Sequence, residues 1–236
     1  METLNVNTID KVIAQARSEN RIALLEHEAK IIVREYGITI PKFQLATNEK
    51  EAARIAQEIG FPVVAKIVSP EILHKSDAGG VKVGLNTVAD VEAAYRTIME
   101  NAKAYDSKAN LLGVLIMEMA PKGTEVIVGA IKDSQFGATL MFGLGGIFVE
   151  VLKDVTFKIA PVSMDEAREM INGLKASALL KGYRNTDPVD IDALAQVLVS
   201  ISNLLMDHPE IRELDLNPVM AYAKGVSTVD ARIILE

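Results

Sequence analysis

Lys66 and His74 are the residues whose types and surroundings most strongly suggest phosphate chemistry. Lys66 stands inside the apolar run Val63–Val68, which indicates a short strand buried on both faces. An ammonium group there loses its hydration unless an anion or a carboxylate meets it. The alternative is that Lys66 lies at a frayed strand end and extends its side chain to water.

His74 follows in a loop that ends with the glycine pair Gly79-Gly80. Imidazole is a nucleophile that can accept and release a phosphoryl group, and the glycines permit a mobile loop or a close approach of backbone to phosphate. The alternative is a solvated loop histidine without function. His27 and His208 are interpreted as structural.

A row of oxygen-bearing side chains lies near the C-terminus. Glu213, Asp215 and Asn217 alternate with apolar residues, so they project from one face of one strand. Such a row suits a hard cation, although an exposed polar sheet face would show the same alternation. Pro218 cannot donate to a ladder and predicts an edge or an interruption of the strand.

A second strand is expected to complete this cation site. A turn centred on residues 224–225 would place Asn217 opposite Arg232 and diagonal to Asp230 on the same face. Magnesium bound with a nucleotide takes only one or two protein oxygens and fills its other positions with phosphates and water. We therefore expect a magnesium site at Asn217, Asp230 and Asp215.

Composition narrows the protein class. At 236 residues and 49% hydrophobic content, the chain can bury the core of one large domain or two small ones. A formal charge of -7 argues against nucleic-acid binding, and the absence of cysteine excludes disulfides, thiolate metal sites and a cysteine nucleophile. No apolar run reaches the length of a membrane span and the N-terminus does not resemble a signal peptide, so a cytoplasmic protein is expected.

Hydrophobic periodicity predicts alternating helices and strands, typical of an α/β or α+β protein. Capping boxes at Thr87 with Asp90 and at Ser163 with Glu166 begin two helices. The other expected helices are 20–37, 50–60 and 191–205. The expected strands are 38–45, 63–68, 81–85, 112–119, 124–132, 138–142, 149–162, 212–222 and 227–235, with hairpin turns at 133–135 and 223–225.

These residues, taken in order, resemble an ATP-grasp domain of the nucleoside-diphosphate-forming acyl-CoA synthetase superfamily. The pattern SPxxxHKxDxGGV from Ser69 to Val81 is similar to that of the beta subunit of ADP-forming acetyl-CoA synthetase. The other carriers of the resemblance are Lys66, Leu115–Glu118, Glu125–Gly129, Asn217-Pro218 and Asp230. Succinyl-CoA synthetase beta subunits are similar in part, but they lack the loop histidine.

The resemblance implies an ATP-grasp fold of two α+β subdomains with the nucleotide held between them. It implies a smaller nucleotide-binding subdomain at 38–119 and a larger one, 1–37 with 120–236, that carries the metal site. The implied nucleotide-binding residues are Lys66, Gly79, Gly80, Val81, Glu118, Met119 and Glu125. The implied cofactors are ATP or ADP and Mg²⁺, held by Asn217 and Asp230.

The resemblance also implies a reaction. Acetyl-CoA, ADP and phosphate would give acetate, ATP and CoA, with His74 carrying phosphate between ADP and a phosphohistidine of a CoA-binding alpha subunit, in an α2β2 heterotetramer. Lys66 would assist as a catalytic cation. Two alternatives stay open: another ATP-grasp ligase that forms an acyl phosphate, and a non-catalytic nucleotide-sensing module. At Lys158, where relatives often carry arginine, a phosphate role is doubtful.

Overall fold

The computed structural model describes residues 6–146, 149, 151–183 and 187–236. The chain divides into two compact units, one made of 1–24, 28–40 and 121–236 and the other of 25–27 and 41–120. The smaller unit thus includes Leu25–His27, a segment that the sequence had assigned to the larger subdomain. Within the described residues, no helix is long and apolar enough to cross a membrane.

The smaller unit contains a four-stranded sheet in the order β1-β4-β2-β3. Its strands are β1 (Phe43–Ala46), β2 (Val63–Val68), β3 (Val81–Leu85) and β4 (Gly113–Glu118), and every neighbouring pair is antiparallel. All six residues of β2 are buried, as the unbroken apolar run predicted. Lys66 therefore lies in an inner strand.

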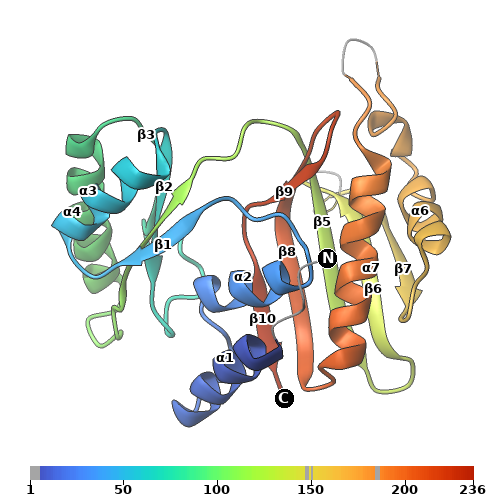
Figure 1. Cartoon of the computed structure of the whole chain (residues 1–236), viewed down its shortest axis with the longest axis horizontal. Coiled ribbons are helices and arrows are strands. Elements are labelled where there is room, and N and C mark those ends of the chain that lie inside the picture. The colour runs from blue at the N-terminus through green and yellow to red at the C-terminus, as the bar shows by residue number, and fades with distance from the viewer. Residues whose placement is uncertain (1–5, 147–148, 150, 184–186) are drawn as a thin grey trace. The chain divides into compact units, whose positions relative to one another are not determined.

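Two helices pack on the smaller sheet, α3 (Glu49–Ile59) and α4 (Val88–Tyr105) (Figure 1). Asn48 caps α3, because its side chain accepts a hydrogen bond from the amide of Glu51. Thr87 and Asp90 form the predicted capping box at the start of α4. These local signals fix where both helices begin.

The larger unit contains a six-stranded antiparallel sheet in the order β10-β8-β5-β6-β7, with β9 also paired to β8. Its strands are β5 (Thr124–Asp133), β6 (Gly137–Leu144), β7 (Val155–Ile159), β8 (Ile211–Ala221), β9 (Val226–Thr228) and β10 (Arg232–Leu235). The predicted hairpin between β5 and β6 is confirmed. Asp133 Oδ1 holds its turn by accepting from the amides of Gln135 and Phe136, at 2.8 and 2.9 Å.

Helices α6 (Met164–Asn172) and α7 (Ile191–Asp207) lie beside each other along this sheet (Figure 1). Ser163 and Glu166 form the predicted capping box of α6, and a short 3₁₀ helix, Ser177–Leu179, follows it. Helices α1 (Val6–Ser18) and α2 (Glu26–Glu35) come first in the chain, and their apolar residues join the same core.

The predicted helix at 20–37 is wrong in its first turns, because α2 begins only at Glu26. The residues before it pair with the last strand instead: the amide of Leu24 donates to the carbonyl of Ile233 at 3.0 Å, and that of Leu235 donates to the carbonyl of Ile22 at 2.7 Å. Long-range pairing has overridden helical periodicity. Two predicted strands are also shorter, since only 43–46 and 155–159 form them; Glu150 lies outside the described residues.

Candidate active site

Lys66 meets a carboxylate, which excludes the interpretation of a solvent-directed side chain. Its Nζ lies 2.8 Å from Glu26 Oε1, and the side chains of Lys66 and Glu26 are 7% and 1% exposed. Both residues belong to the smaller unit, although 40 positions separate them. A buried ammonium held this way keeps its charge at a fixed point, which is what a phosphate-binding lysine requires.

The loop that carries His74 is tied to the same carboxylate. Lys75, the next residue, places its Nζ 3.0 Å from Glu26 Oε2. The loop is bracketed by the buried residues Ile72 and Ala78, whereas His74 itself is exposed. The imidazole is thus presented to solvent from an anchored segment.

The two glycines, Gly79 and Gly80, allow the loop backbone to pack closely against Asn101 and Ile67. A Cβ on Gly80 would lie 2.4 Å from Ile67 Cγ2, and one on Gly79, whose φ is +60°, would lie 2.7 Å from Asn101 Nδ2. The amide of Gly80 donates to the carbonyl of Lys75 at 2.8 Å, and its own carbonyl accepts from the amide of Ile67 at 2.8 Å. In this conformation a larger side chain would clash at either position, so the two glycines allow the close approach of backbone that was one of the two expectations.

The other predicted nucleotide-binding residues of the smaller unit lie in its four-stranded sheet or at the end of one of its strands. Val81 stands opposite Lys66 in the β2–β3 ladder. Glu118, the exposed last residue of β4, accepts from the amide of Lys42 at 3.4 Å, a long contact that leaves its carboxylate oriented only loosely. Met119 follows and its amide donates to the carbonyl of Pro62 at 3.2 Å.

In the larger unit, Asn217 and Asp230 lie level with each other across two strands. The register differs by two residues from the expected one: Asp215, not Asn217, stands opposite Arg232. Val219 pairs with Thr228, and Asp215 pairs with Arg232, so Asn217 and Asp230 lie midway between these two pairs. Asp230 itself lies between β9 and β10, so the two residues stand nearly opposite each other rather than diagonally.

Pro218 interrupts β8 as predicted, but not at a sheet edge. The pairing of β5 with β8 runs from Val126–Val219 to Val128–Leu216, so Asn217 and Pro218 together oppose the single residue Ile127. This arrangement is a β-bulge, which re-aims side chains and often borders functional sites. The bulge leaves Asn217 exposed.

Asp215 has an electrostatic environment of its own. Burial raises the pKa of its carboxyl group, Asp230 raises it further, and Arg232 opposes both effects. The interaction with Asp230 shows that the two carboxylates act on each other. A cation bound between them would relieve that repulsion.

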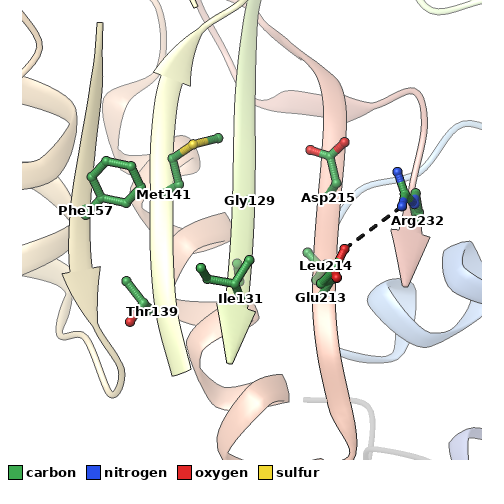
Figure 2. Close-up of a pocket in the computed structure, with 10 residues that line it drawn as sticks. Gly129, Ile131, Thr139, Met141, Phe157, Glu213, Leu214, Asp215 and Arg232 are labelled. Carbon is green, nitrogen blue, oxygen red and sulfur yellow. Dashed lines mark ion pairs between the residues drawn. The ribbon is translucent and has the colours of Figure 1, made fainter. Parts of the chain in front are cut away.

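Asp215 also borders a hollow of about 360 Å³ on the sheet face away from α6 and α7 (Figure 2). Gly129 lies opposite Asp215 in the sheet and has no side chain to fill the hollow. A Cβ atom at this position would lie 3.2 Å from Met141 Cε. The hollow is lined by Gly129, Ala130, Ile131, Thr139, Met141, Phe157, Glu213, Leu214, Asp215 and Arg232.

Two other sequence candidates are also placed. Glu125 is exposed on β5 and its carbonyl accepts from the amide of Gly145 at 2.7 Å. Lys158 contacts helix α6 instead of the hollow: its Nζ lies 2.9 Å from Glu169 Oε2 and 3.5 Å from Glu166 Oε1. Those ion pairs give Lys158 a structural use.

Sequence reasoning missed Glu26 and the hollow. Glu26 carried a signal, namely an acidic residue directly after Leu24-Leu25 at the start of an apolar helical pattern. The isolated Gly129 inside a strand pattern indicated a close approach at that point. Neither signal names a partner, because partners come from the tertiary fold.

Known proteins resemble this chain over nearly its whole length. A family model described as an ATP-grasp domain matches residues 15–235. The beta subunit of ADP-forming acetate–CoA ligase I of Pyrococcus furiosus is 52% identical over 95% of this chain and 97% of its own length.

Solved structures agree with this match. Acetyl-coenzyme A synthetase 1 of Ca. Korarchaeum cryptofilum, in complex with coenzyme A and Ca-AMPCP, has a TM-score of 0.94 and 49% identity over 96% of this chain and 99% of that one. Another structure of that enzyme, with Mg-AMPPCP and a phosphohistidine segment pointing towards the nucleotide binding site, has a TM-score of 0.86 and 46% identity over 97% of this chain and 100% of that one.

Proposed function

The chain belongs to the ATP-grasp family, among the beta subunits of ADP-forming acetate–CoA ligases, and we propose that it performs the nucleotide half of that reaction through Lys66 and His74. The observation that carries the assignment of residues is the shared carboxylate of Glu26, which ties the Lys66 ammonium and the His74 loop to one point. The whole reaction would convert acetyl-CoA, ADP and phosphate into acetate, ATP and CoA.

Lys66 would neutralise charge on the nucleotide phosphates. Its ammonium group is buried and already oriented, so little reorganisation is needed when phosphate arrives. Glu118, Met119 and Glu125 are proposed to contact the adenine and ribose, together with backbone groups at Gly79, Gly80 and Val81. The amide of Gly80 is already bonded within the loop, so we assign that residue to shaping the site.

Asn217 and Asp230 fit a nucleotide-bound magnesium ion. They provide one amide oxygen from β8 and one carboxylate from the segment between β9 and β10, beside Asp215 as a second carboxylate. Asn217 and Asp230 would hold this ion, and it would supply positive charge against the phosphates during transfer. The relative that binds Mg-AMPPCP supports this choice of cation.

His74 is proposed to carry the phosphoryl group. An imidazole nitrogen would form a bond to the γ-phosphorus of ATP as the bond between that phosphorus and the bridging oxygen breaks, and ADP would leave with the electron pair. The reverse step would return the group to ADP. No oxidation or reduction is involved.

A partner subunit completes the proposal. The relative of Pyrococcus furiosus is named a beta subunit, which implies a second type of subunit, and we propose that it binds CoA and assembles with this chain as an α2β2 heterotetramer. We expect this complex to be cytoplasmic.

The test is to incubate the chain with Mg²⁺ and γ-labelled ATP and to map acid-labile phosphate by mass spectrometry. Label is expected on His74, absent from His74→Asn, and strongly reduced in Lys66→Met. Lys108→Met, which removes an exposed lysine, is the matched control and should retain full labelling.

Full activity of the complete ligase with His74→Asn would contradict the carrier role. Formation of acyl hydroxamate by this chain alone would instead identify a different acyl phosphate ligase. Binding of ATP without any phosphohistidine would support a nucleotide-sensing module.

A further inference from the structure

We propose that Glu26 is a positioning residue that holds the phosphate-binding lysine and the phosphoryl-carrying loop in register with each other. This inference rests on the proposed function, because it assumes that Lys66 meets nucleotide phosphates and that His74 accepts a phosphoryl group. It assigns a role in that reaction to a residue that touches neither the nucleotide nor the phosphoryl group.

The geometry at Glu26 is that of a bridge. Oε1 lies 2.8 Å from Lys66 Nζ, and Oε2 lies 3.0 Å from Lys75 Nζ. The two oxygens of one rigid carboxylate thus hold two ammonium groups at neighbouring positions. The Lys66 contact is a charge-assisted hydrogen bond, which is directional and fixes position as well as charge, whereas the Lys75 contact is an ion pair.

Burial makes the bridge sensitive to the loss of any one of its members. The Glu26 side chain is 1% exposed, and those of Lys66 and Lys75 are 7% and 21% exposed, so water can compete little for these contacts. Loss of one member of a buried ion pair leaves its partner charge without compensation. Glu26 is therefore expected to be more sensitive to substitution than a surface carboxylate in an ion pair.

The bridge acts on His74 through Lys75. The Lys75 side chain contacts Glu26, while its carbonyl accepts from the amide of Gly80 at 2.8 Å. Asn101 secures the same turn by donating to the carbonyl of Gly79 at 3.1 Å. His74 precedes Lys75 directly, and its own carbonyl accepts from the amide of Ala78 at 3.4 Å, so the ion pair of Lys75 is a second contact that restrains it.

Removal of the Lys75 ammonium should therefore loosen His74 without unfolding the loop. The hydrogen bonds of Gly79 and Gly80 would remain, and the nucleotide site would keep Lys66 paired with Glu26. A misplacement of the reacting group by about 1 Å can slow transfer about 100-fold, so we expect a loss of about 10- to 100-fold in His74 phosphorylation.

The experiment measures two quantities on the full chain: the affinity for Mg-ATP, and the rate at which His74 is phosphorylated at saturating Mg-ATP. Lys75→Met should slow phosphorylation and leave affinity unchanged, whereas Lys75→Arg, which keeps the charge, should restore most of the rate. Glu26→Gln should reduce both quantities because it releases Lys66 as well. Glu58→Gln removes an exposed partner of Arg54 and is the matched control.

A double variant sharpens the test. If the bridge is real, Glu26→Gln with Lys75→Met should phosphorylate His74 no more slowly than Glu26→Gln alone, since the Lys75 contact is already lost. Hydrogen exchange of residues 69–80 should rise in Lys75→Met, while the thermal midpoint stays close to that of the unsubstituted chain.

Two outcomes would overturn the inference: an unchanged phosphorylation rate in Lys75→Met, or a rate that falls only in proportion to nucleotide affinity. Failure of the unsubstituted chain to form phosphohistidine at residue 74 would contradict the proposed function instead. The two failures are thus distinguishable.

Discussion

Substitution of Gly80 by alanine tests how tightly the His74 loop is packed on β2. The added methyl group would lie 2.4 Å from Ile67 Cγ2, against the 3.4 Å at which ordinary contact begins, so the shortfall is 1.0 Å. It would also lie 3.0 Å from the carbonyl oxygen of Lys75. Something in this region must therefore move.

The backbone around Gly80 has little freedom to move. Its amide and its carbonyl are both bonded at 2.8 Å, to Lys75 on one side and Ile67 on the other. Overpacking a well-filled site costs about 1–3 kcal/mol, whereas glycine to alanine at an unstrained site would stabilise by about 0.4–1 kcal/mol through the unfolded chain. We expect the clash to dominate and the protein to lose about 1–3 kcal/mol.

Thermal unfolding measures this effect. A protein of this size shifts its midpoint by about 2–4 °C per kcal/mol, so Gly80→Ala should unfold about 2–12 °C lower. It should also slow His74 phosphorylation. Gly84→Ala is the control: it lies on β3 at a φ of +70° with nothing within 4 Å, so it costs backbone strain without pressing on the loop.

A midpoint for Gly80→Ala equal to or above that of the unsubstituted chain would refute the steric argument. Equal slowing of His74 phosphorylation by Gly80→Ala and Gly84→Ala would also refute it, because Gly80, unlike Gly84, contacts the segment that carries His74.

Three further predictions concern the larger unit. Asp215→Asn should raise the thermal midpoint at neutral pH, because burial raises the pKa of Asp215 and its ionised form is disfavoured in the fold; the advantage should vanish below pH ~3.9, where both states are protonated. Asp133→Asn should do the opposite, since backbone amides lower the pKa of Asp133. Asn217→Ala and Asp230→Asn should each weaken Mg-ATP binding at limiting Mg²⁺, measured by calorimetry, and excess Mg²⁺ should restore it; insensitivity to Mg²⁺ would exclude the metal role.

The sequence predicted best those features that depend on neighbouring residues. Both capping boxes formed, at Thr87 and at Ser163, because each needs only a side chain and a residue three positions later. The turn after Asp133 and the strand around Lys66 also formed, because their signals likewise lie within a few neighbouring residues. Helix α1 was missed although Ile9, Ile13 and Ala16 show its periodicity.

Features that depend on distant residues were predicted less well. No sequence signal near residues 22–24 predicts that they pair with the last strand, β10, instead of extending helix α2. The register at Asn217 was displaced by two residues, because the position of the turn was inferred from a Lys-Gly pair alone. The partner of Lys66 lies 40 residues away, beyond the reach of spacing arguments.

The assignment of Leu25–His27 to the smaller unit has a consequence for the modularity of this fold. A fragment cut at residues 41–120 would contain Lys66 and Lys75 but not Glu26, and it would expose Val68 and Leu115 where Leu25 now packs. Recombination that exchanges this unit between relatives therefore has to transfer the first turn of α2 as well. This unit is inherited as two pieces of chain, and a crossover placed between them would separate a buried charge from its counter-ion.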